Sequence, residues 1–118
     1  MKTLKIWHNP NCSKSREAKS ILENSNQKFE VFEYLKKDFD AAALKEIIKL
    51  LGISDVRAML RTKEEEYTQL NIDNSDLTQD QIINLVVLNP KLVERPIVIK
   101  EDKAVIGRPM NNVVELLD

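Results

Sequence analysis

The segment LKIWHNPNCSKSR (residues 4–16) decides the fold, because it joins an apolar run to an amphipathic run through a short polar loop. Leu4–Trp7 is predicted to be a strand, and Ser13–Asn24 a helix with its apolar residues on one face. The next run, Lys28–Tyr34, is rich in Phe, Val and Tyr and is predicted to be a second strand. The chain therefore opens with a β-α-β unit, and its first βα loop lies at the end of a parallel strand pair where sites usually form.

Cys12, the only cysteine of the chain, lies in that loop. A thiol at a helix N-terminus faces unpaired backbone N–H groups and the positive end of the helix dipole, both of which stabilise a thiolate. His8, Lys14 and Arg16 add ionisable or cationic groups nearby. The alternative is a buried cysteine that acts as a small apolar residue, but the polar neighbours in the sequence favour a reactive thiol.

The segment Cys12-Ser13-Lys14-Ser15 also has the C-x-x-S form of single-thiol redox proteins. Because no second cysteine is present, any disulfide turnover must use an external thiol such as glutathione. One cysteine and one histidine do not supply the ligands of a zinc site, so no metal is expected.

The composition indicates one ordinary globular domain over residues 1–118, with 42% apolar and 31% charged residues. The formal net charge of -1 gives no reason to expect nucleic-acid binding. No apolar run approaches the roughly 20 residues of a membrane span. Because Met1–Thr3 leads straight into a strand, we expect no secretory leader, and a free, activated thiol favours a cytoplasmic protein. A monomer is expected.

Residues from about 40 to 90 are predicted to form a helical insertion, in which each helix has a start or stop signal. The predicted helices are 41–51 between Asp40 and Gly52, a short one from its cap Ser54 to Arg61, and one opened by the Thr78–Gln81 capping box and ended by Asn89-Pro90. Strands then return. Ile97–Ile99 and Ala104–Ile106 are predicted to form a hairpin, followed by a last helix over Met110–Leu117.

Three arginines, Arg61, Arg95 and Arg108, are candidates for oxyanion binding. A guanidinium group is permanently charged, and its forked donors match tetrahedral oxyanions. Arg95 and Arg108 directly precede proline, which restricts the backbone and can fix the direction of the side chain. Taken singly, each arginine could be a solvated surface charge. A tyrosine-phosphatase-type loop is disfavoured, because only three residues separate Cys12 from Arg16.

Several segments together resemble the glutaredoxin-dependent arsenate reductase family (ArsC), in order and from the first strand to the last helix. They are His8-Asn9-Pro10-x-Cys12-x-x-Ser15-Arg16, Gly52-Ile53-Ser54, Val56-Arg57-Ala58-Met59-Leu60-Arg61, Tyr67-x-Gln69-Leu70, Arg95-Pro96-Ile97-Val98 and Arg108-Pro109. The resemblance implies an α/β, thioredoxin-like (glutaredoxin-like) fold with a mixed four-stranded sheet and a helical insertion.

The resemblance also implies the roles of individual residues. Cys12 would be the nucleophile. The oxyanion would be bound by Arg61, Arg95 and Arg108. Within residues 56–61, this role falls to Arg61 rather than Arg57. His8 and Ser15 would help to lower the pKa of the thiol. Pro96 would follow a cis peptide bond opposite the cysteine.

The implied activity is reduction of arsenate to arsenite, for arsenic detoxification, with glutathione as co-substrate and glutaredoxin as partner. No metal, flavin or nicotinamide would be bound. Two alternatives remain open. A glutathione-dependent thiol reductase of the same fold would keep Cys12 but should lose the arsenate-specific arginines. A non-enzymatic regulator that binds RNA polymerase would not need three arginines converging on a cysteine.

Overall fold

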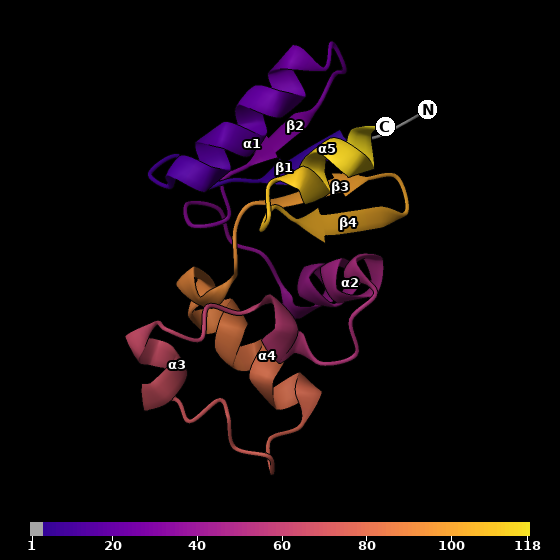
Figure 1. Cartoon of the computed structure of the whole chain (residues 1–118). Coiled ribbons are helices and arrows are strands. Elements are labelled where there is room, and N and C mark those ends of the chain that lie inside the picture. The colour runs from indigo at the N-terminus through magenta and orange to yellow at the C-terminus, as the bar shows by residue number, and fades with distance from the viewer. Residues whose placement is uncertain (1–3) are drawn as a thin grey trace. The chain divides into compact units, whose positions relative to one another are not determined.

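The computed structural model describes residues 4–118; Met1–Thr3, on which the expectation of no leader depends, lie outside the described residues. Figure 1 shows the course of the chain. Its elements are β1 (Leu4–Trp7), α1 (Ser13–Asn24), β2 (Glu30–Phe32), α2 (Ala41–Leu51), the 3-10 helix η1 (Val56–Met59), α3 (Glu65–Gln69), α4 (Gln79–Leu88), the 3-10 helix η2 (Pro90–Leu92), β3 (Ile97–Lys100), β4 (Lys103–Ile106) and α5 (Asn111–Leu117).

The described chain divides into two compact units. The first combines the residues up to Asp38 with Arg95–Asp118, and the second is the intervening segment Phe39–Glu94. The predicted single domain with an insertion at about 40–90 is not tested by this division and stays a prediction.

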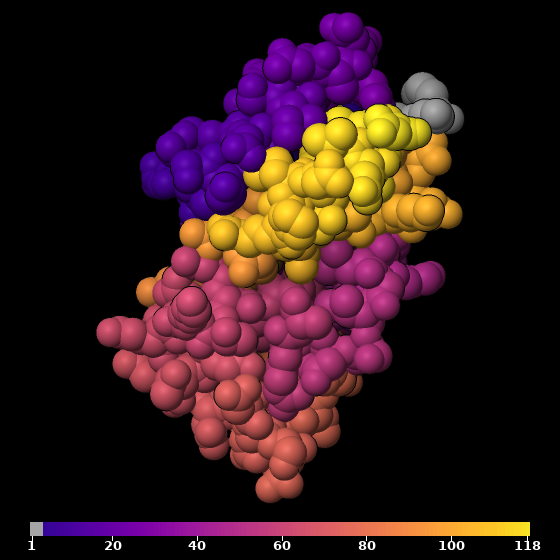
Figure 2. Space-filling view, viewed as in Figure 1, coloured from indigo at the N-terminus to yellow at the C-terminus, as the bar shows by residue number. Residues whose placement is uncertain are grey.

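The first unit contains a mixed four-stranded sheet, as predicted, and its strand order is β2-β1-β3-β4. β1 runs parallel to β2 and antiparallel to β3, and β4 returns antiparallel beside β3. Segments from both ends of the sequence thus meet in this unit, where α1 also contacts α5. Figure 2 shows them side by side on the surface, the N-terminal part in indigo and α5 in yellow.

Helices α1 and α5 cover one face of this sheet and bury its apolar side chains. On β1, Leu4 and Ile6 point to that face, and Val98 is the register partner of Ile6 on β3. The buried cluster consists of Leu4, Ile6, Ala18, Leu22, Val98 and Val113. Since β1 and α1 both contribute to it, this packing fixes the loop between them, which carries Cys12.

The predicted helix ends of the second unit are largely confirmed. The Asp40 side chain caps α2 by accepting a hydrogen bond from the Ala43 N–H at 2.8 Å. Gly52 ends α2 in the left-handed region, with φ 71°, where a glycine has no steric cost. At α4 both bonds of the capping box between Thr78 and Gln81 are formed.

Other predictions for the elements were wrong in detail. The cap after α2 is Asp55, not Ser54, because the Asp55 carboxylate accepts from the Arg57 N–H at 3.0 Å. The helix that follows stops at Met59 and does not reach Arg61, since Leu60 pairs with Val93 in an isolated β-bridge. Strand β2 is also shorter than predicted.

Helix α3 was not predicted, and it carries little sequence signal. Its capping residue Glu64 makes no side-chain cap bond, and Tyr67 is its one buried residue, so no apolar periodicity marks it. Across residues 4–118, no helix has the length and apolar character needed to span a bilayer.

Candidate active site

Cys12 occupies the N-cap of α1, directly after the loop that leaves β1. Its N–H donates to the Asn9 carbonyl at 3.0 Å, and its carbonyl accepts from the Arg16 N–H at 3.0 Å. The Arg16 guanidinium turns back to donate to the Pro10 carbonyl at 2.9 Å. The loop is therefore closed at both ends by hydrogen bonds, and Cys12 is buried, with 8% of the residue exposed.

The surroundings of the Cys12 sulfur favour the thiolate. Burial alone would raise the pKa of the Cys12 thiol. The backbone N–H of Ser15, the charge of Arg95, the backbone N–H of Lys14 and a donor of the Arg95 side chain outweigh that effect and hold the pKa below its ordinary value. No side-chain cap bond of ordinary geometry forms at this helix start, so the N–H groups act on the sulfur through their dipoles.

Arg108 lies beside the same sulfur, although it is 96 positions away in the sequence: its Nη2 is 3.8 Å from Cys12 Sγ. Its Nε donates to the Arg95 carbonyl at 2.9 Å, so the Arg108 side chain is bound to the backbone of Arg95, another of the three predicted arginines. The Arg95–Pro96 peptide bond is cis, as is Arg108–Pro109. The structure thus brings Cys12, Arg95 and Arg108 together within the first unit.

His8 and Ser15 form a buried pair next to this group. His8 Nδ1 lies 2.6 Å from Ser15 Oγ, which also accepts from the Asn9 N–H at 2.9 Å. Burial lowers the pKa of His8, and Lys19 and Arg16 lower it further against the opposing effect of Glu33. His8 is therefore neutral at neutral pH. It supports the loop through Ser15, whose backbone N–H in turn stabilises the thiolate.

Arg61 lies in the second unit, and its approach to Cys12 stays a prediction. Its backbone N–H donates to the Leu92 carbonyl at 2.7 Å, and its Nη1 pairs with Glu64 Oε1 at 2.6 Å. Glu64 was not among the predicted site residues. Its spacing of three residues from Arg61 was the available signal, since the turn between them, closed by the Glu64 N–H bond to the Arg61 carbonyl at 3.1 Å, brings the two side chains together.

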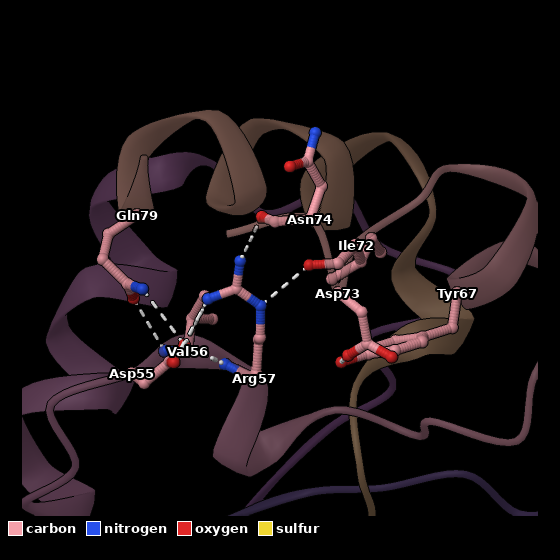
Figure 3. A network of polar contacts seen from close by, with 8 residues as sticks. All are labelled: Asp55, Val56, Arg57, Tyr67, Ile72, Asp73, Asn74 and Gln79. Atoms are coloured by element: carbon pink, nitrogen blue, oxygen red, sulfur yellow. Dashed lines mark hydrogen bonds and ion pairs between the residues drawn. The ribbon is translucent and has the colours of Figure 1, made fainter. Parts of the chain in front are cut away.

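Arg57 has a different environment, as Figure 3 shows. Its Nε and Nη2 donate to the carbonyls of Ile72 and Asn74 at 2.8 and 2.9 Å, and its Nη1 pairs with Asp55. Asp55 also accepts from Gln79 at 3.0 Å. These contacts hold η1 against the 72–74 loop and the start of α4, so the Arg57 guanidinium serves the architecture of the second unit.

Among residues 4–118, no group of three or more His, Cys, Asp or Glu side chains is placed to hold a metal ion. The chemistry of the first unit rests on a stabilised thiolate with two guanidinium groups beside it. Such a site suits an anion that a sulfur nucleophile can attack. The sheet, its helices and the position of the cysteine define a thioredoxin-like protein.

Comparison with known proteins gives the family. The profile of the ArsC family matches residues 7–116, so the chain belongs to that family. It is 49% identical to an arsenate reductase of Haemophilus influenzae, over 95% of this chain and 97% of that protein. It is 45% identical to the uncharacterized protein YfgD of Escherichia coli (strain K12), over 98% of each chain. Among solved structures, an arsenate reductase from Vibrio cholerae has a TM-score of 0.92 at 42% identity, with 96% of both chains covered.

Proposed function

We propose that this protein is an arsenate reductase that uses glutathione and glutaredoxin as reductants. The observation that carries the proposal is the contact of Cys12 Sγ with Arg108 Nη2 at 3.8 Å, at a thiol whose pKa is held low. Relatives of near-equal length carry the name arsenate reductase, which supports the same activity for this protein.

The first step proposed is attack of the Cys12 thiolate on the arsenic(V) atom. A sulfur–arsenic bond forms, and one arsenic–oxygen bond breaks as a hydroxyl group of arsenate takes up a proton from solvent and leaves as water. Arsenate and the thiolate are both anions, so they repel each other until cations offset the charge. Arg95 and Arg108 are placed to do this, and their forked donors fit the arsenate oxygens. Arg61 is proposed as the third such group.

The later steps need two further thiols, because the chain has no second cysteine. Glutathione forms a second sulfur–arsenic bond with loss of another water. The glutaredoxin thiolate then attacks the glutathione sulfur, and the electron pair of that sulfur–arsenic bond passes to arsenic, which becomes arsenic(III). Water finally releases arsenite from Cys12 and restores the thiol. Each turnover thus oxidises two external thiols to one mixed disulfide.

An assay of arsenite formation with one component omitted at a time tests the proposal. Activity that requires arsenate, glutathione and glutaredoxin together is the expected result. A parallel assay with a glutathione mixed disulfide as substrate tests the alternative of a general thiol reductase. Turnover of the disulfide without any arsenite formation would contradict the proposal and favour that alternative.

A further inference from the structure

Gly107 lies immediately before Arg108, in a place where a side chain does not fit. Its N–H donates to the Pro96 carbonyl at 2.9 Å, and the residue is buried. A Cβ atom at Gly107 would come within 2.8 Å of Pro96 Cγ and 3.2 Å of Val113 Cγ2. The proline side chain is closed into a ring on the backbone nitrogen, so it cannot turn aside as a flexible side chain can. Any larger residue must therefore push the end of β4 away from Pro96.

This contact extends the β3–β4 hairpin towards the active site. The register of the hairpin ends at the pair Ile97–Ile106. Just beyond it, the Gly107 N–H donates to the Pro96 carbonyl. Arg95 and Arg108 come next along the chain on either side, and the Arg108 side chain joins them by donating from Nε to the Arg95 carbonyl. Gly107 and Pro96 are the direct neighbours of Arg108 and Arg95. The distance between Gly107 and Pro96 therefore determines the distance between the two arginines.

We propose that Gly107 is a positioning residue: its missing side chain lets Pro96 pack against the end of β4, and this contact holds Arg95 and Arg108 at the Cys12 sulfur. The arsenate part of the inference rests on the proposed function, whereas the effect on the thiol does not. Displacement of Gly107 would move Arg108 Nη2 away from Sγ and separate the charge of Arg95 from the thiolate.

The chain offers a matched control, because it has only one other glycine, Gly52. Gly52 is needed for its backbone conformation, φ 71°, and a Cβ there would meet nothing within 4 Å. Alanine at Gly52 strains the backbone, whereas alanine at Gly107 creates a collision. The two variants therefore separate a general loss of stability from a displaced site.

The experiment compares wild type, Gly107→Ala and Gly52→Ala. Thiolate absorbance and the rate of alkylation by iodoacetamide are measured against pH, and the alkylation rate reports on Cys12 alone because it is the only cysteine. For Gly107→Ala we expect the Cys12 pKa to rise towards that of a free thiol. We also expect kcat/KM for arsenate to fall about 10- to 100-fold. Gly52→Ala should melt at lower temperature yet keep the wild-type Cys12 titration.

A folded Gly107→Ala protein with the wild-type Cys12 titration would overturn the proposal. Should Gly107→Ala be recovered unfolded, the double variant Gly107→Ala/Val113→Ala takes its place, since removal of both valine γ-methyl groups, Cγ2 among them, leaves room for the strand end to shift. A raised Cys12 pKa in the double variant, with Val113→Ala alone unchanged, supports the proposal, and an unchanged pKa contradicts it. If the wild type itself forms no arsenite, the proposed function fails while the thiol titration still decides the role of Gly107.

Discussion

Arg95 and Arg108 lie two residues beyond Ile97–Ile106, the last register pair of the β3–β4 hairpin, and the Arg108 Nε donates to the Arg95 carbonyl at 2.9 Å. In this bond the Nε of Arg108 binds the backbone, and the Nη2 of the same guanidinium then lies 3.8 Å from Cys12 Sγ. The position of the Arg108 side chain thus depends on the forked shape of the guanidinium as well as on its charge. This arrangement makes a lysine at position 108 a poor substitute.

The first prediction is that Arg108→Lys lowers kcat/KM for arsenate by about 100-fold, close to the effect of Arg108→Ala, because the lysine loses the Nε donor and the forked geometry. Steady-state kinetics of both variants check it. Lys103→Gln, which removes an exposed cation from the far end of the same hairpin, should change kcat/KM by less than about twofold. Wild-type activity in Arg108→Lys would show that charge alone suffices.

The second prediction concerns the pH dependence that Arg95 imposes. Cys12 has a lowered pKa in the folded protein, so the alkylation rate should rise with pH through a midpoint below that of a free thiol. Folding stability gained from the thiolate is present above the free-thiol pKa and is lost as pH falls through the lowered value. Arg95→Gln removes one cause of the lowering, so the Cys12 midpoint should move to higher pH. An unmoved midpoint would exclude Arg95 as a partner of the thiolate.

The third prediction concerns His8, the only histidine, whose ring protons give an isolated NMR titration. Burial, Lys19 and Arg16 lower the pKa of His8, whereas Glu33 raises it. The midpoint should therefore lie below that of a free histidine, rise in Lys19→Gln and fall in Glu33→Gln. Protonation of His8 favours the unfolded chain, so its contribution to stability is lost as pH falls below the free-histidine value. A midpoint at or above that value would contradict the buried, neutral imidazole.

The fourth prediction concerns Glu64, which pairs with Arg61 at 2.6 Å. If Arg61 binds arsenate as proposed, the carboxylate competes with the substrate for the guanidinium. Glu64→Gln should then lower KM for arsenate about two- to fivefold at nearly unchanged kcat, the range expected when a partly exposed ion pair is removed. The neighbouring exposed Glu65 provides the control variant Glu65→Gln. An unchanged or higher KM in Glu64→Gln would argue against Arg61 in the site.

Local patterns in the sequence account for much of this structure. The bounds of β1 and α1 follow from the switch from a short apolar run to helical spacing, and Cys12 falls on the cap between them. The hairpin strands were each predicted one residue short of the observed turn at Glu101–Asp102. Because a short turn fixes the register, the pairing of Ile97 with Ile106 follows from the hairpin itself, and Arg95 and Arg108 come two residues beyond that pair.

Other features depend on contacts between distant residues and left no local signal. The close approach of Gly107 and Pro96 arises from packing, which neither residue reveals alone. Ser54 and Asp55 are adjacent and both are good caps, and the contact with Gln79, far along the chain, accompanies the use of Asp55. The neutral state of His8 follows from its burial, which the polar loop sequence does not suggest.

The most direct measurement of the central claim is arsenite formation by the folded Cys12→Ser variant beside the wild type, with glutathione and glutaredoxin in excess. Serine is nearly isosteric with cysteine, so circular dichroism and the melting temperature should stay close to those of the wild type. Its hydroxyl is far less nucleophilic at neutral pH. We predict arsenite from the wild type and none above background from Cys12→Ser; appreciable arsenite from the folded variant would contradict Cys12 as the nucleophile.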